Sequence, residues 1–275
     1  MNQNNKKILE IIYESGLIAQ KYFNNKNNII KFKKDKSPIS KADTEINKYL
    51  EKNIKKIYKN ALFLSEEDTY KKQISAIEKK EFFIIDPIDG TSSFLEGSKD
   101  FTINVSYIKN NILQFSSIYI PMYDIMYFAD NKDSFKISSK KSFLENNIFK
   151  LNDVKNIKNN IVKIITTKRK NEIEEIKKYL LNSYRDYQYF HISSSKKFSD
   201  LSEGIYDIYI RKAQIKLWDV VAGFHLTNNV GLEILDMSGN NLFEIFLNKN
   251  YLSKIVENNF RVDEFIIKPK NLKIF

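Results

Sequence analysis

The chain has 275 residues, a formal net charge of +11 and 42% hydrophobic residues, enough apolar material for one large domain or two joined lobes. It contains no cysteine, which excludes disulfides, thiolate metal sites and cysteine nucleophiles, and only two histidines, His191 and His225, which are too few for a multi-histidine zinc site. Its seven glycines lack the spacings of a P-loop or a dinucleotide fingerprint, so any phosphate chemistry must use another device.

The positive charge is compatible with nucleic acid, a membrane surface or a phosphorylated small molecule as partner. It is equally compatible with surface lysines that have no binding role. The lysines are scattered and no nucleic-acid-binding motif is present, so we expect no nucleic-acid partner. No apolar run reaches the ~18 residues of a spanning helix, and the start lacks a signal peptide. We therefore expect a cytoplasmic protein. Peripheral contact with the cytoplasmic face of the inner membrane and the oligomeric state stay open.

The first half of the chain predicts two amphipathic helices and a sheet. Apolar residues recur at helical spacing in two segments, and a continuous apolar run, typical of a buried strand, ends at Asp86-Pro87. Three β-rich runs joined by short polar links then predict an antiparallel meander. We expect helices at residues 6–23 and 40–58, a strand or loop at 31–39, a strand at 61–64 and a loop or irregular helix at 69–80. The buried strand is expected at 82–85, and the meander at 101–108, 112–120 and 125–129.

The second half predicts alternating strands and helices. Residues 131–158 are the most polar stretch and the best candidate for a lobe boundary, so we divide the chain into lobes 1–145 and 146–275. Beyond the boundary we expect strands at 161–166, 188–192, 205–210 and 232–235, and helices at 171–181, 196–202 and 219–228. An antiparallel meander followed by alternating strands and helices indicates an α/β or layered α+β fold.

Acidic residues gather where predicted strands or loops end, as active-site residues often do in sheet-based folds. The clusters are Glu66-Glu67-Asp68, Asp86-Pro87-Ile88-Asp89-Gly90-Thr91 and Trp218-Asp219. In the second cluster a tight turn brings Asp89 back beside Asp86, and Gly90 permits a backbone approach that a side chain would block. Carboxylates suit hard divalent cations, and free N–H groups at a following helix start suit phosphate oxygens. Together they predict metal-assisted phosphate chemistry.

Each cluster also has a structural alternative. Asp-Pro and Asp-Gly are common turn pairs, which alone would explain Asp86 and Asp89. Glu66 and Glu67 are equally typical of a solvated loop, and Asp219 of a helix N-cap.

These clusters resemble the signature motifs of the inositol monophosphatase superfamily. The members of that superfamily are lithium-sensitive, magnesium-dependent phosphomonoesterases. A fourth segment, Pro38-Ile39-Ser40-Lys41-Ala42-Asp43, is similar to the family's upstream motif, and the four stand in family order over residues 38–223. Residues 101–105, 118–121 and 194–198 further resemble the bacterial 3′(2′),5′-bisphosphate nucleotidase (CysQ) branch. Ser92-Ser93, Ser193 and Val230 depart from the usual residues of that branch. The resemblance implies an αβαβα sandwich of the sugar-phosphatase kind.

The resemblance also implies two or three Mg²⁺ ions per site. Glu66, Asp86 and the Ile88 carbonyl would hold one metal, and Asp86, Asp89 and Asp219 another. Backbone N–H groups of Gly90 and Thr91 would seat the phosphate. The implied substrate contacts are Glu66, Ile88, Asp89, Gly90, Thr91, Ser92, Lys197 and Asp219.

The implied catalytic residues are Asp43, Thr91 and Glu67. Thr91 and Asp43 would polarise the attacking water, and Glu67 would help to order metal-bound waters. Asp43 also fits a capping box with Ser40, and the two roles can coexist. Lys197 would contact a substrate phosphate or ribose, with a solvated lysine as the alternative. Both histidines are interpreted as structural.

By this resemblance the expected reaction is removal of the 3′-phosphate from adenosine 3′,5′-bisphosphate by metal-activated water, giving AMP and phosphate, a step of sulfur metabolism. An inositol or sugar monophosphatase is the alternative within the class. A basic nucleic-acid-binding module is the distant alternative.

Overall fold

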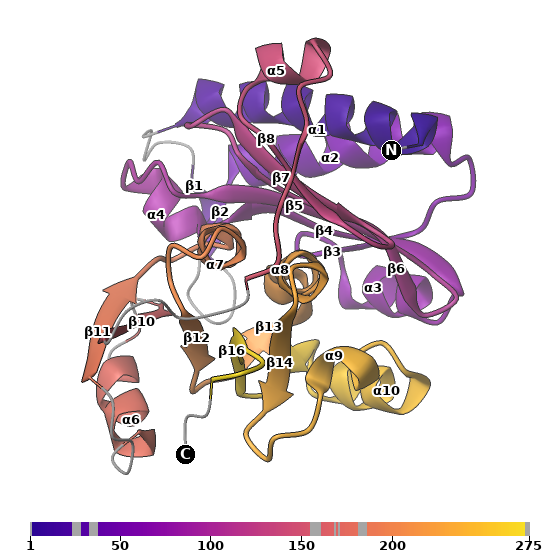
Figure 1. The fold of residues 1–275 in the computed structure, drawn as a ribbon. Helices are drawn as coiled ribbons and strands as arrows, with labels where there is room; N and C mark the ends of the chain where they lie inside the picture. Colours follow the sequence, from indigo (N-terminus) through magenta and orange to yellow (C-terminus); the bar gives the residue numbers. More distant parts are fainter. Residues whose placement is uncertain are drawn as a thin grey trace.

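The protein is built from five alternating helix and sheet layers, as the sequence predicted (Figure 1). The computed structural model describes residues 2–23, 29–32, 38–154, 161–167, 169, 171–180 and 186–272. From one side to the other the layers are α1 with α2, a seven-stranded sheet, α7 with α8, a five-stranded sheet, and α6 (Figure 1). The described helices contain none that is long and apolar enough to cross a membrane.

The first sheet has the order β3-β4-β5-β6-β7-β8-β9, with β3 and β4 parallel and the later pairs antiparallel. The expected meander is confirmed as β5 to β7. The strands are β3 Phe63–Ser65, β4 Glu81–Asp89, β5 Thr102–Lys109, β6 Ile112–Ile120, β7 Ile125–Asp130, β8 Ser134–Ile137 and β9 Phe149–Lys150. The other elements of this half are α1 Gln3–Tyr22, β1 Ile29–Phe32, β2 Pro38–Ser40, α2 Lys41–Ile57, α3 Tyr70–Ile77, α4 Thr91–Leu95 and α5 Lys140–Leu144.

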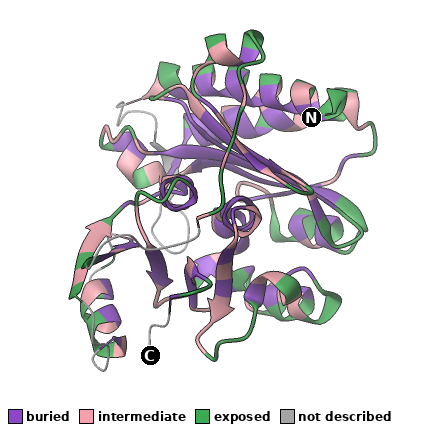
Figure 2. Cartoon of the chain, viewed as in Figure 1, coloured by how far each residue is buried: buried purple, intermediate pink, exposed green. Residues whose placement is uncertain are grey.

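The two predicted amphipathic helices cover the outer face of this sheet. Ile12 of α1 and Ile46 and Leu50 of α2 are completely buried in a cluster that includes Phe83 and Phe115 of the sheet. Figure 2 shows this division, with inward helix faces buried and outward faces exposed. Helical periodicity therefore placed these helices correctly, because one apolar stripe must face the sheet.

The second sheet has the order β11-β10-β12-β16-β14. Its strands β10, β11 and β12 are parallel, whereas β16 is antiparallel to both neighbours. The strands are β10 Ile161–Thr166, β11 Asp186–His191, β12 Ile208–Arg211, β14 Leu232–Asp236 and β16 Phe265–Pro269, with a separate pair β13 Ile215–Lys216 and β15 Arg261–Val262. The helices are α6 Glu172–Tyr179, α7 Lys196–Ser202, α8 Leu217–Asn229, α9 Leu242–Ile245 and α10 Lys249–Glu257.

Several predicted boundaries were wrong. The buried strand continues past Asp86-Pro87 to Asp89, and residues 70–77, interpreted as a loop or irregular helix, form helix α3. The polar stretch 131–158 holds β8 and β9, which extend the first sheet to Lys150. The polar composition of this stretch did not indicate strands, because short strands near the edge of a sheet bury few apolar side chains.

Helix α8 is the central element, packed between the two sheets (Figures 1 and 2). Ten of its residues are buried, including Phe224 and Leu226 on different faces. Its Gly223 admits α7 closely, because a Cβ there would lie 2.2 Å from the Phe198 ring. The N-terminal end of α8, which carries Asp219, is therefore fixed by both lobes.

His225 joins α8 to the meander. Its ring is buried, and Nδ1 lies 2.9 Å from Ser116 Oγ of β6. Burial lowers the pKa of His225 from its ordinary 6.5 to about 4, opposed by the nearby Asp130. The structural role expected for this histidine is consistent with these contacts.

We predict that this histidine weakens the fold in acid. Its folded pKa lies below its unfolded value, so its stabilisation is complete above pH 6.5 and is lost as pH falls toward 4. The loss amounts to about 3 kcal/mol at 1.36 kcal/mol per pKa unit. Urea unfolding of the wild type and His225→Gln between pH 7 and 4.5 should show a steeper loss for the wild type. Parallel curves would contradict this assignment.

Candidate active site

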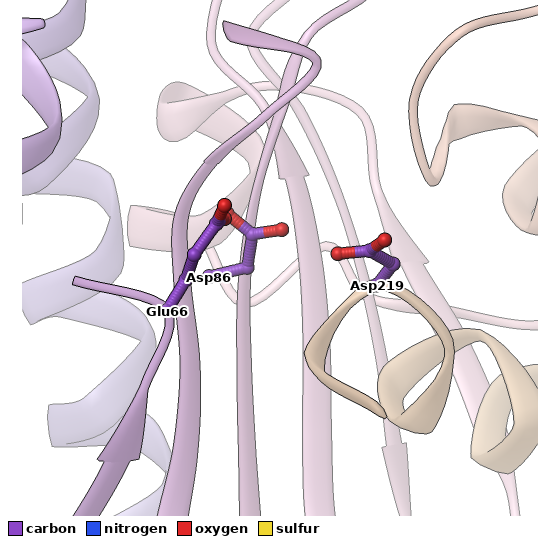
Figure 3. A group of neighbouring side chains, drawn as sticks. All are labelled: Glu66, Asp86 and Asp219. Atoms are coloured by element: carbon purple, nitrogen blue, oxygen red, sulfur yellow. The ribbon is translucent and has the colours of Figure 1, made fainter. Parts of the chain in front are cut away.

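Three carboxylates from separate elements meet at one point where the first sheet approaches the start of α8. Glu66 follows β3, Asp86 lies in β4 and Asp219 lies in the first turn of α8. One oxygen of each lies within 4.8 Å of the others, and the three side chains face one another (Figure 3). All three were among the residues that the sequence singled out as metal ligands.

Parallel pairing of β3 and β4 brings Glu66 beside Asp86. Ser65 pairs with Ile85, and the Glu66 N–H donates to the Ile85 carbonyl at 3.1 Å. The pairing of β4 with β5 then shifts register between Asp86 and Asp89. Pro87 lacks an N–H and fits such an irregularity, so the strand continues while its carboxylates change direction.

Asp86 carries the strongest sign that a cation belongs here. Its side chain is 1% exposed, and neither oxygen has a hydrogen-bond partner among the described residues. Burial raises its pKa well above the ordinary value, and the charges of Glu66, Asp89 and Asp219 raise it further. The pKa of Asp219 is raised too, first by burial and then by Asp89 and Glu66. A buried carboxylate without donors, such as that of Asp86, fits a divalent cation, which prefers oxygen ligands.

Asp89 lies next to this trio but is held by another partner. Its Oδ2 accepts hydrogen bonds from the N–H and the hydroxyl of Ser195, both at 2.5 Å. The same hydroxyl lies 2.8 Å from the Asp219 carbonyl oxygen and 3.0 Å from Asn104 Nδ2. Ser195 thus connects elements of both lobes at the site. Ser195 belongs to the segment 194–198 that resembles the nucleotidase branch, but the sequence assigned it no role at the site.

Asp43 and Thr91 form the pair that the resemblance implied. Thr91 Oγ1 lies 3.2 Å from Asp43 Oδ1 and 3.0 Å from the Ile88 carbonyl oxygen. The capping box with Ser40 is also confirmed, since Asp43 Oδ2 accepts from the Ser40 N–H at 2.9 Å. Burial raises the Asp43 pKa to about 7; Ser40 opposes this shift, and Glu67 and Glu66 add to it. Both expected contacts therefore coexist in one side chain.

The turn before α4 depends on glycine rather than on a capping hydroxyl. Gly90 is the N-cap at φ +91°, a left-handed conformation that favours glycine, and a Cβ there would lie 3.5 Å from Ser194 Cβ. No side chain caps this helix, and the hydroxyl residues Thr91, Ser92 and Ser93 lie inside it. The N-cap alternative for Asp219 is wrong, since Lys216 occupies that position.

Lys197 is buried rather than solvated. Its side chain is 2% exposed, and Nζ donates to the Ser194 carbonyl at 2.5 Å. Burial lowers its pKa to about 8; Asp89 and Asp219 oppose that shift, while Arg211 adds to it. The solvated alternative is therefore wrong, and contact with substrate stays a prediction. Arg211, which the sequence analysis missed, also acts electrostatically on Asp219.

The roles expected for Ser92 and Glu67 stay predictions. Ser92 is exposed on α4, and the Glu67 N–H donates to Ser65 Oγ at 3.3 Å. The neighbouring Ser93 lies 2.8 Å, hydroxyl to hydroxyl, from Ser193 across the lobes. Two of the departures from the nucleotidase branch therefore contact each other.

Comparison with known proteins places this geometry in a family. The family model described as "Inositol monophosphatase family" matches residues 4–269. The chain belongs to the inositol monophosphatase family. It is 28% identical over 241 residues to the 3′(2′),5′-bisphosphate nucleotidase CysQ of Buchnera aphidicola, covering 86% of this chain and 85% of that protein.

Solved structures of this family share the layered fold. CysQ from Bacteroides thetaiotaomicron superimposes with a TM-score of 0.71 at 19% identity, covering 98% of each chain. An IMPase from Thermotoga maritima gives a TM-score of 0.72 at 17% identity, covering 94% of this chain and 89% of that one. The expected αβαβα architecture is thereby confirmed.

We predict that removal of one buried charge stabilises the metal-free protein. Asp86→Asn keeps the shape of the side chain and removes a carboxylate whose own pKa is raised by burial and by the charges of Glu66, Asp89 and Asp219. In EDTA its Tm should exceed that of the wild type by about 3 °C or more, roughly 1 kcal/mol for a chain of this size.

Mg²⁺ should then raise the Tm of this variant less than that of the wild type. Asp263→Asn, which removes an exposed carboxylate paired with Lys254 at 2.6 Å, is the matched control and should not raise the Tm. A lower metal-free Tm for Asp86→Asn would contradict the electrostatic account.

Proposed function

We propose that the protein is a magnesium-dependent phosphomonoesterase that removes the 3′-phosphate of adenosine 3′,5′-bisphosphate, releasing AMP and phosphate. The observation that carries the proposal is the buried Asp86, whose oxygens lack donors and face Glu66 and Asp219. Membership in a phosphatase family supports the reaction class. The absence of cysteine fits a reducing cytoplasm, where we place the enzyme.

The proposed metal ligands are Glu66, Asp86, Asp89, Asp219 and the Ile88 carbonyl. Bound Mg²⁺ would supply Lewis acidity, lowering the pKa of water and neutralising phosphoryl charge. Gly90 leaves space for close approach of a phosphate to the turn, and its backbone N–H and that of Thr91 would donate to phosphate oxygens.

Asp43 and Thr91 would handle the proton of the attacking water. The Thr91 hydroxyl can donate to Asp43 Oδ1 and at the same time accept a hydrogen bond from water. Such a relay would orient a water lone pair toward phosphorus while Ser40 keeps the carboxylate fixed. Glu67 would hydrogen-bond further water molecules at the edge of the site.

The choice of a nucleotide substrate rests on the relatives and on two cations. Curated relatives that cover most of the chain are named as bisphosphate nucleotidases. Lys197 and Arg211 add positive charge beside Asp89 and Asp219, as a substrate with a second phosphate requires. An inositol or sugar monophosphatase is the second candidate, favoured by the similarity of fold to the Thermotoga maritima IMPase.

We predict that Asp89→Asn abolishes turnover without unfolding the protein. The change removes one carboxylate charge that a metal needs and leaves the buried apolar core untouched. Phosphate release should fall by about 10³-fold or more, a loss of roughly 4 kcal/mol of transition-state stabilisation. Asp263→Asn serves as control with unchanged activity. Full activity of Asp89→Asn in a malachite-green assay would overturn the ligand set.

A substrate panel tests the proposed specificity. With Mg²⁺ present, phosphate release from adenosine 3′,5′-bisphosphate should exceed that from inositol 1-phosphate and sugar phosphates, and Li⁺ should inhibit it. Turnover of inositol 1-phosphate with none from the bisphosphate would favour the second candidate. No release from any of these would remove the proposed function.

A further inference from the structure

The turn that carries Glu66 is held by buried polar side chains from two helices that do not belong to the carboxylate cluster. Ser65 is the first residue of this turn and is completely buried. Its hydroxyl donates to Asn47 Oδ1 of α2 at 2.7 Å and accepts from the Glu67 N–H at 3.3 Å. Its carbonyl accepts from Gln73 Nε2 of α3 at 2.7 Å and from the Asp68 N–H at 3.1 Å.

The far end of this turn is fixed as well. Lys72 of α3 lies 2.7 Å from both Asp68 Oδ1 and Glu51 Oε1, and Asn47 Nδ2 donates to the same Glu51 oxygen at 3.2 Å. Asn47 and Gln73 are 7% and 5% exposed, so their bonds form out of water, where a lost partner is costly. Residues 65–68 are therefore held at both ends from α2 and α3.

One face of α2 serves two parts of the site. Asp43, Asn47 and Glu51 stand four residues apart, so they line one stripe of the helix. Asp43 contacts Thr91, Asn47 contacts Ser65, and Glu51 contacts Lys72. Because the helix is rigid, it fixes the separation between the turn of Glu66 and the turn of Thr91.

We propose that Asn47, Ser65 and Gln73 are positioning residues for the metal site: they hold the backbone of the Glu66 turn so that the Glu66 carboxylate meets Asp86 and Asp219. The inference rests on the proposed metal-dependent function. A metal ion binds more tightly when its ligands are already held in position. Loosening this turn should therefore lower the affinity for metal more than it lowers the stability of the fold.

The test uses Ser65→Ala and Gln73→Met in the full chain. The first removes the central hydroxyl, and the second retains side-chain bulk while removing the donor to the Ser65 carbonyl. Ser134→Ala is the matched control, because Ser134 is equally buried and donates to the Leu226 carbonyl at 3.0 Å, about two helical turns from Asp219. Mn²⁺ binding is measured by electron paramagnetic resonance, and Tm is measured in EDTA.

We expect the Kd for Mn²⁺ to rise about tenfold or more in Ser65→Ala and Gln73→Met, the scale seen when supports of metal ligands are removed. Ser134→Ala should lose similar thermal stability and bind Mn²⁺ like the wild type. In activity assays excess Mg²⁺ should restore much of the lost rate, which a general loss of folding would not allow. If Ser65→Ala does not fold, the Mn²⁺ affinity of Gln73→Met alone tests the positioning role.

Two failures are distinguishable. Wild-type Mn²⁺ affinity in folded Ser65→Ala and Gln73→Met would overturn the positioning role and leave the proposed function standing. A wild-type protein that binds no Mn²⁺ would instead overturn the metal-dependent function itself. Equal weakening in Ser134→Ala would also overturn the positioning role, because the effect would then follow stability alone.

Discussion

Repulsion among three closely placed carboxylates, one buried and two partly buried, is the constraint on which the rest of the structure depends. Glu66, Asp86 and Asp219 place oxygens within 4.8 Å of one another where burial already penalises charge. Such a cluster does not stabilise the fold by itself, because the charges of Glu66 and Asp219 raise the pKa of Asp86. A divalent cation held by these oxygens would offset the repulsion, which is why the cluster fits a metal site.

The first sheet and α8 depend on each other through this site. Glu66 follows β3, Asp86 lies in β4 and Asp43 lies at the start of α2, whereas Asp219 comes from α8. Ser195 joins them, since it bonds both Asp89 of β4 and the Asp219 carbonyl. Because α8 packs between both sheets, a change in lobe packing would move Asp219 relative to Asp86 (Figure 1). The geometry of the site therefore follows from the burial of α8.

Much of the fold and of the carboxylate set could be predicted from the sequence, for physical reasons. Helical periodicity marked α1 and α2, because a single apolar stripe must face the sheet. We predicted no strand beyond Leu235, so β16 was missed, although its apolar residues Phe265–Ile267 resemble a buried strand. Its place between β12 and β14 is set by pairing across distant parts of the chain, which local pattern does not report.

The supporting polar contacts could not be predicted. Asn47 and Gln73 stand among lysines and glutamates on their helices, so in sequence they resemble a solvated face. Only the packing of α2 and α3 against the end of β3 turns them into buried donors and acceptors. Lys197 shows the same limit, since nothing local distinguishes a buried lysine from an exposed one.

The most direct test of the central claim is the position of a bound divalent ion. Crystals grown with Mn²⁺ should give an anomalous difference peak at ligand distance, about 2.1 Å, from oxygens of Glu66, Asp86 and Asp219. That result would show that the buried charge of Asp86 is compensated by metal. A structure at saturating Mn²⁺ with no peak among these three carboxylates would contradict the account.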